Sequence, residues 1–63
     1  MFSGEKLREM RINTGWSQQK LSKESKVSYG YIAELENGKK KPSFEVVEKL
    51  ASAMEITISE LQE

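Results

Sequence analysis

The apolar positions of this chain fall into five short groups, and each group has the same kind of polar start. A Ser or Thr follows an apolar residue or proline and precedes an apolar residue by four positions, the spacing of a helix N-cap with its hydrophobic staple. The sets are Phe2/Ser3/Leu7, Trp16/Ser17/Leu21, Val27/Ser28/Ile32, Pro42/Ser43/Val47 and Ile56/Thr57/Leu61. Glu60 completes a capping box with Thr57. The pattern predicts an all-α domain without a sheet, with five helices at roughly 4–13, 18–25, 29–36, 44–54 and 58–62.

The apolar sides of these segments predict which residues form the core. A wide stripe on residues 44–54 is expected to close it, and its members are Phe44, Val47, Leu50, Ala51 and Met54. The buried stripe of residues 4–13 includes a cation, Arg11, which needs a partner inside the protein. Glu36, at the inner edge of residues 29–36, is expected to form an ion pair with it. Trp16 is expected to be a core aromatic.

The link between residues 18–25 and 29–36 consists only of Lys26 and Val27. A turn this short between crossing helices usually needs one residue in the left-handed region. Glycine would be least strained there, so Lys26 is expected to cost about 1 kcal/mol relative to glycine. Ser22 and Ser25 are small enough to let the two helices approach closely.

The end of the chain carries more apolar surface than so short a helix can bury internally. Ile58 and Leu61 are the residues in question. Two roles are open for them, capping the core and forming a dimer contact, and one residue can serve both.

The segment 29–36 has an unusual division of faces. Ile32 and Leu35 form a narrow apolar side that suits docking against the rest of the domain. The opposite side carries Gly30, Ala33 and Glu34, with Tyr29 and Tyr31 on its flanks, and it runs into Lys39, Lys40 and Lys41. Such a helix suits insertion into a nucleic-acid groove, with bases read by the helix and phosphates bound by the lysines. A solvated helix followed by a charged loop is the other interpretation.

The composition restricts the remaining possibilities. With 63 residues, the chain has room for a single domain over 1–63. It lacks Cys, His and Asp, so we expect no disulfide, no metal site, no cofactor and no enzymatic constellation. No apolar run is long enough to span a bilayer and no signal peptide is recognisable, which leads us to expect a cytoplasmic protein.

The net charge of zero conceals an uneven distribution. Residues 1–41 hold nine Lys or Arg against five Glu, a charge of +4, whereas residues 42–63 hold one Lys against five Glu, a charge of −4. A basic part joined to an acidic part is typical of an oriented nucleic-acid binder, although solvated helices can give the same sums.

Four segments of the chain together resemble a known family. GEKLREMR, GWSQQKLS, VSYGYIAELENGKKKPS and LASAMEITISELQE are similar to successive parts of the Cro/phage-repressor type helix-turn-helix domain, the XRE family. The resemblance implies a compact five-helix, lambda-repressor-like fold whose second and third helices form the DNA-binding unit. Members are mostly bacterial or phage transcription regulators and are commonly dimeric.

The resemblance also implies roles for individual residues. Base contacts are expected from Ser28, Tyr29, Gly30, Ala33 and Glu34. Phosphate contacts are expected from Ser17, Gln18, Gln19, Tyr31, Asn37, Lys39 and Lys41. The chain departs from the family pattern where Lys26 replaces the turn glycine and Ser22 an alanine. No Gln or Arg occupies a base-reading position, and Glu34, which can only accept hydrogen bonds, is suited to a cytosine amino group.

Together these observations predict a small transcriptional regulator, with a repressor as the expected form. It would bind double-stranded DNA sequence-specifically, as a homodimer, with residues 29–36 in the major groove. We expect a bacterial or phage protein associated with the nucleoid. The alternative is a protein-interaction module of the same fold, such as an antitoxin-like or adaptor component whose partner binds the acidic, apolar C-terminal face.

Overall fold

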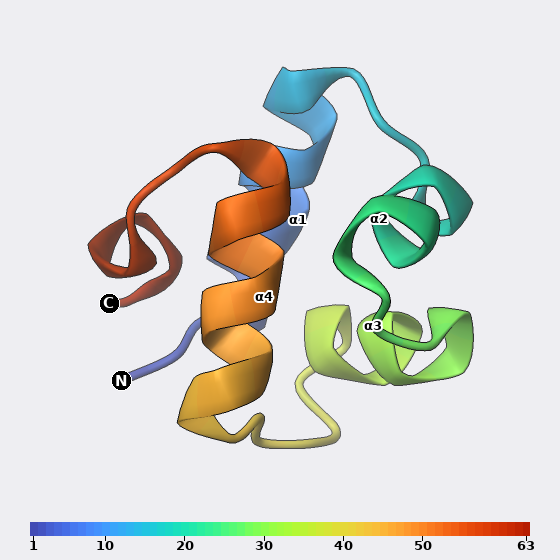
Figure 1. Ribbon diagram of the computed structural model, residues 1–63. Helices are drawn as coiled ribbons and strands as arrows, with labels where there is room; N and C mark the ends of the chain where they lie inside the picture. The colour runs from blue at the N-terminus through green and yellow to red at the C-terminus, as the bar shows by residue number, and fades with distance from the viewer.

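Four α-helices and a short C-terminal 3-10 helix form the fold, and the computed structural model describes all residues from 1 to 63 (Figure 1). The α-helices are α1 (Gly4–Thr14), α2 (Gln18–Ser25), α3 (Tyr29–Glu36) and α4 (Phe44–Met54). The 3-10 helix is η1 (Ile58–Leu61). These bounds lie within one residue of those predicted from the polar starts, and the all-α class is confirmed.

Serine side chains start all four α-helices in the same way. The hydroxyl oxygens of Ser3, Ser17, Ser28 and Ser43 each accept a hydrogen bond from the backbone N–H three residues further on. Each such cap satisfies a backbone donor that the helix leaves unpaired, and is worth about 1 kcal/mol. Four of the five predicted caps are therefore present.

The fifth predicted start does not form an α-helix. Thr57 makes no capping bond, because the backbone N–H of Glu60, which a capping box would use, donates to the carbonyl of Thr57 itself at 3.1 Å. The Thr57 hydroxyl lies 3.0 Å from the hydroxyl of Ser59 instead. The bond from Glu60 N–H to the Thr57 carbonyl closes a 3-10 turn. The predicted capping box is therefore wrong, and the fifth of the five predicted short helices is a 3-10 helix, so a fold of five α-helices is not confirmed.

Ten buried apolar side chains form one core between the helices. They are Leu7, Leu21, Val27, Ile32, Leu35, Val47, Leu50, Ala51, Met54 and Leu61. Trp16, predicted as a core aromatic, is half-buried and packs against this core from its edge.

Phe44 was predicted to be part of the core, and this prediction is wrong, since the residue is 67% exposed. It is the first residue of α4, and side chains on a helix point back toward its N-terminus. Phe44 therefore extends beyond the layer in which Val47 and Leu50 meet the other helices.

The two ends of the chain lie together and hold η1 against the domain (Figure 1). The backbone N–H of Ser3 donates to the carbonyl of Leu61 at 2.9 Å, and that of Glu63 to the carbonyl of Met1 at 2.8 Å. Between them, Phe2 and Gln62 form an isolated antiparallel bridge. Leu61 is fully buried in the core, where η1 packs against α1 and α4, so its assignment as a dimer contact is wrong. Ile58 is only half-buried.

The turn between α2 and α3 has the predicted left-handed residue. Lys26 has a φ of 63°, and the hydroxyl of Ser22 donates to the carbonyl of Val27 across the turn at 2.6 Å. The serine that replaces the family alanine thus braces a turn that lacks the family glycine. A second left-handed residue, Glu55 with a φ of 58°, ends α4 and was not predicted.

None of the helices is both long and apolar enough to cross a membrane.

Candidate nucleic-acid interface

The inner side of α3 fixes which of its residues face outward. Ile32 and Leu35 are fully buried in the core. Of the five residues predicted to contact bases, Gly30, Ala33 and Glu34 lie on the opposite side. Tyr29 lies on its flank, and Ser28 is the N-cap. Ser28, Tyr29 and Gly30 are exposed, and Ala33 and Glu34 are partly exposed. The structure thus brings these five side chains onto one surface of the molecule.

Gly30 leaves the helix backbone uncovered by a side chain near the start of α3. A Cβ atom added at Gly30 would have no neighbour within 4 Å, so the helix backbone itself is open there. Tyr29, 50% exposed, stands beside it as the one large side chain. A helix with a bare backbone next to an aromatic ring can approach the floor of a groove closely while the ring contacts its wall.

An ion pair joins α1 to the end of α3, as expected from the helical stripe of α1. Arg11 Nε and Nη2 donate to the Glu36 carboxylate at 2.6 and 3.0 Å. Arg11 Nη1 also donates to the carbonyl of Trp16 at 2.9 Å. The hydrogen bond to Glu36 raises the pKa of Arg11, and the Glu36 charge adds to this effect while burial opposes it. The pair holds the loop end of α3 rigidly against the body.

Gln18 joins this ion pair, which changes its expected role. Its Nε2 donates to Glu36 Oε1 at 3.0 Å, so the side chain faces inward rather than toward a phosphate. Glu36 thereby links α1, α2 and α3 through one carboxylate, whose side chain is only 3% exposed. Gln18 can still contribute to phosphate binding through its position at the N-terminus of α2, where backbone N–H groups are free.

The other predicted phosphate ligands differ in solvent exposure and in whether they already form hydrogen bonds within the protein. Gln19, Asn37, Lys39 and Lys41 are exposed. Ser17 is exposed too, but its hydroxyl already caps α2 by accepting from the N–H of Lys20 at 3.0 Å. Tyr31 is half-buried because its ring packs against the core.

The loop after α3 folds back beside the helix. Gly38 has a φ of 75°, and the N–H of Lys39 donates to the carbonyl of Glu34 at 2.9 Å. These are the marks of a Schellman C-cap, which reverses the chain direction at the helix end. As a result Lys40 Nζ lies 3.9 Å from Glu34 Oε1.

Lys40 belongs to the lysine cluster predicted to bind phosphates, but it was not named as an individual contact, and its pairing with Glu34 was not predicted. The signal that could have identified it is Asn37-Gly38, since a helix stop at this place returns the residues that follow toward Glu34.

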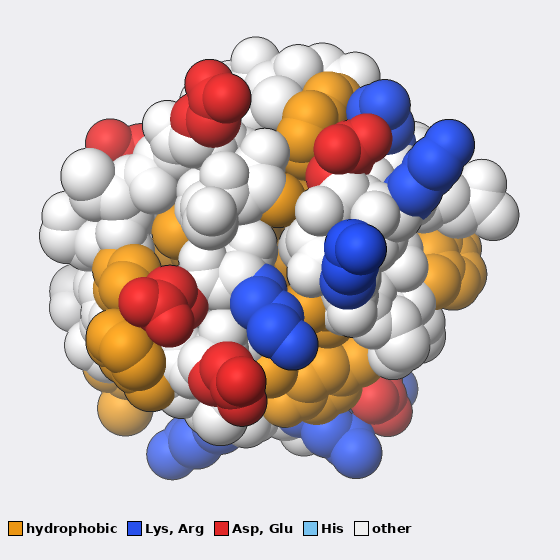
Figure 2. Space-filling view, in the orientation of Figure 1, with side chains coloured by type: hydrophobic (Ala, Val, Ile, Leu, Met, Phe, Trp, Pro, Cys, Tyr) orange, Lys and Arg blue, Asp and Glu red, His pale blue; other side chains and the backbone are white.

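Basic and acidic side chains are unevenly distributed over the surface (Figure 2). In Figure 2, basic side chains gather over α2, at the upper right, and further ones lie along the lower edge of the view. Acidic side chains are more prominent on the opposite side, which is occupied by α4 and the C-terminal segment. The basic excess of residues 1–41 therefore lies on α1, α2, the turn at Lys26 and the lysine loop, since α3 itself carries two Glu and no Lys or Arg.

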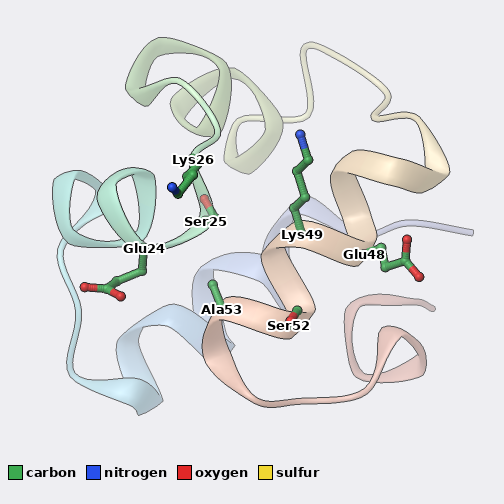
Figure 3. A pocket seen from close by; sticks show the side chains of 7 residues that line it. All are labelled: Glu24, Ser25, Lys26, Glu48, Lys49, Ser52 and Ala53. Atoms are coloured by element: carbon green, nitrogen blue, oxygen red, sulfur yellow. The ribbon is translucent and has the colours of Figure 1, made fainter.

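The surface has four hollows, and one of them is bordered by Lys40 and Lys41 of the loop after α3. The largest, of about 400 Å³, lies between α2 and α4 and is drawn in Figure 3. It is lined by Glu24, Ser25, Lys26, Glu48, Lys49, Ser52 and Ala53. In Figure 3 the side chains of Glu24 and Glu48 point away from each other, and Ala53 is the one apolar lining residue. Small-molecule sites are usually closed and mostly apolar, which this hollow is not. No cluster of three or more potential metal ligands is present.

Comparison with known proteins agrees with this geometry. A family model described as helix-turn-helix matches residues 7–61. Transcriptional regulator ClgR of Mycobacterium tuberculosis is 34% identical over 56 residues, which are 89% of this chain and 50% of that protein. HTH-type transcriptional regulator DdrOP3 of Deinococcus deserti is 36% identical over 59 residues, 94% of this chain and 46% of that protein. The chain spans about half the length of these curated relatives.

Solved structures share the fold closely. The restriction-modification controller protein C.AhdI from Aeromonas hydrophila has a TM-score of 0.90 and 36% identity, over 94% of this chain and 89% of that one. The clp gene regulator ClgR from Corynebacterium glutamicum has a TM-score of 0.86 and 33% identity, over 92% and 62%. Fold and outward α3 surface together define a helix-turn-helix domain. Within that class, the chain belongs to the Cro/C1-type, or XRE, family.

Proposed function

We propose that this chain binds double-stranded DNA as the DNA-binding domain of a small transcriptional regulator, with α3 in the major groove. The observation that carries the proposal is the construction of α3. Its inner side is fixed by Ile32 and Leu35, its outer side is small and polar around Gly30, and its C-terminal loop returns lysines to the same surface.

Within this function the residues divide into two groups. Tyr29 and Glu34 lie where base edges would be, with Ser28, Gly30 and Ala33 between them. Lys39 and Lys41 carry unpaired charge in the exposed loop and are assigned to phosphates, as are Gln19 and Asn37. The N-terminus of α2, at Ser17 and Gln18, presents protein backbone N–H groups that would also bind DNA phosphates.

We further propose that the chain binds DNA as a two-fold dimer. Its principal dimensions are 24 × 21 × 19 Å, smaller than one turn of duplex DNA at about 34 Å. Eight residues make α3 about 12 Å long, too short to contact more than one half-site. Two copies would place two α3 helices on half-sites about one helical turn, or roughly 10 base pairs, apart. Ile58, half-buried in η1, is the remaining candidate contact.

The relatives support a regulatory role in bacteria, and repression is the form we propose for it. A dimer that covers an operator can block transcription without any further activity. Its place of action would be the bacterial cytoplasm, at the nucleoid.

Selection of bound sequences from random duplexes tests the proposal. The chain is expected to enrich a sequence with two-fold symmetry, and its affinity is expected to fall steeply as salt rises, because phosphate contacts release counterions. If no sequence is enriched and binding to duplexes is absent at low salt, the proposal is wrong. A protein partner that docks on the apolar C-terminal face would instead bind with little dependence on salt.

A further inference from the structure

We infer that Lys40 determines sequence specificity, because it is the internal counterion that holds the Glu34 carboxylate for a cytosine. This inference rests on the proposed function. It gives the middle lysine of the loop a different task from that of its neighbours Lys39 and Lys41.

The contacts around Lys40 separate it from the other two lysines. Lys40 Nζ lies 3.9 Å from Glu34 Oε1, whereas Lys39 and Lys41 have no carboxylate within 4.0 Å. The two partners are about half exposed, with 53% of the Lys40 side chain and 45% of the Glu34 side chain accessible. The pair is thus formed at the surface that α3 would present to DNA, and not in the core.

The backbone holds this pair in place. The left-handed φ of Gly38 and the hydrogen bond from Lys39 N–H to Glu34 carbonyl turn the loop back over the last turn of α3. The residue that follows Lys39 is therefore placed beside Glu34 by the C-cap itself.

A carboxylate on a DNA-reading surface poses an electrostatic problem. Phosphates of the groove walls lie within the Debye length of about 8 Å at physiological salt, so an uncompensated Glu34 is repelled by every sequence. The same carboxylate is a suitable acceptor for the amino group of cytosine in the major groove. A cation that belongs to the protein and approaches Glu34 from the loop side removes the repulsion and leaves a carboxylate oxygen for the base.

Lys40 therefore acts on Glu34 and through it on the base. If it instead bound a phosphate, it would strengthen binding to all sequences equally, as Lys39 and Lys41 are expected to do. The two possibilities differ in what the loss of the lysine does to sequence preference.

The test uses the whole chain and two duplexes. The first duplex is the sequence that the unsubstituted chain enriches most from a random pool, and the second has one C·G pair changed to T·A. The changed pair is the one at which Glu34→Gln loses its preference in the same selection. Affinities for both duplexes are measured for Lys40→Gln and for the matched controls Lys39→Gln and Lys41→Gln, each with and without Glu34→Gln.

Lys40→Gln is expected to reduce the preference for the first duplex by about fivefold, a substantial part of the discrimination one base contact provides. Lys39→Gln and Lys41→Gln should weaken both duplexes equally. In combination with Glu34→Gln, the change at Lys40 should no longer affect preference. Lys40 would then be free to bind a phosphate, so its loss should reduce the salt slope by about 1, as at the control positions.

The result that would overturn the inference is an equal loss of affinity on both duplexes for Lys40→Gln, matching Lys39→Gln. In that case DNA binding stands and Lys40 is an ordinary phosphate ligand. Failure of the unsubstituted chain to enrich any sequence would remove the proposed function and this inference together. Thermal midpoints of the variants should be alike, since exposed ion pairs contribute little to stability.

Discussion

Lys26 and Glu55 both hold a left-handed backbone conformation that L side chains rarely adopt, with φ of 63° and 58°. Both are exposed, so their replacement removes no core contact. Lys26→Gly is expected to stabilise the chain by about 1 kcal/mol, because glycine relieves the clash of Cβ with the backbone. The free energy of unfolding from denaturant titration measures the change.

Lys26→Ala is the matched control. Alanine also has a Cβ, so it should not reproduce the gain, whereas Glu55→Gly should give a similar one at the other site. A loss of stability in Lys26→Gly would contradict this explanation of the turn.

Gly4 and Gly30 lie in the first turns of two different helices, α1 and α3, and are expected to respond oppositely to alanine. A Cβ at Gly4 would overlap the backbone carbonyl oxygen of Leu35, while one at Gly30 would meet nothing. Gly4→Ala should destabilise the chain by about 2 kcal/mol, and Gly30→Ala should stabilise it by about 0.5–1 kcal/mol. Thermal unfolding of both variants distinguishes the cases. Equal effects of the two changes on stability would show that Gly4 of α1 does not pack closely against the Leu35 carbonyl near the end of α3.

The conformation of a single residue could be predicted where the local sequence allows only one. The link of two residues before α3 required a left-handed residue, so Lys26 could be predicted from the sequence. The link after α4 has the same length, since two residues again precede the N-cap, here Thr57, so the same argument applies to Glu55, which was nevertheless missed. The need for glycine at Gly4 arises from a contact with Leu35, which is far away in the sequence.

Among the helices, the ion pair of Arg11 and Glu36 connects α1 with α3. Arg11→Met alone is expected to cost about 3 kcal/mol, because it leaves the buried Glu36 charge with Gln18 as its one partner. The double change Arg11→Met with Glu36→Leu should recover much of that loss. Urea titrations of the single and double variants give the coupling energy.

Recovery in the double variant should be incomplete. The carbonyl of Trp16 and the amide of Gln18 lose their partners when both charges are removed. Simple additivity of the two single changes would mean that the side chains do not interact.

The helices themselves were largely predictable because their starts are local. A serine and the N–H three residues later are sufficient to define a cap, and four such caps formed as expected. The fifth failed because a four-residue 3-10 turn satisfies its donors with backbone carbonyls. For Leu61 the pattern left two roles open, and the structure shows the first of them, a buried place in the core.

At the level of the whole molecule, η1 is the element that we propose to connect two copies. Ile58 is half-buried, and Ile58→Glu is expected to weaken cooperative binding to a duplex with two half-sites by at least tenfold, or about 1.4 kcal/mol. Affinity for a single half-site should not change. Gel-shift titrations on both duplexes provide the measurement.

Leu61→Ala serves as the structural comparison for Ile58→Glu. Because Leu61 is fully buried, its truncation should cost about 2–5 kcal/mol of stability in each copy. If Ile58→Glu lowers stability in the same way and weakens single half-sites equally, Ile58 belongs to the core and another surface forms the dimer.

The charge asymmetry of the whole molecule could be predicted because it follows the chain order. Residues up to Lys41 contain α1, α2, the turn at Lys26 and the lysine loop, so the basic excess lies on these elements. The inward direction of the Gln18 amide and the pairing of Lys40 with Glu34 could not be predicted in this way, since both depend on how α3 ends.

The claim that α3 reads sequence while the loop binds phosphates is tested most directly by repeating the selection from random duplexes with Tyr29→Ala and Lys39→Gln. Tyr29→Ala is expected to change the preferred sequence at one position, by about 1–3 kcal/mol, and to leave the salt slope unchanged. Lys39→Gln is expected to keep the preferred sequence and to reduce the salt slope by about 1. An unchanged preference in Tyr29→Ala, together with salt-dependent binding, would contradict the assignment of α3 as the reading helix.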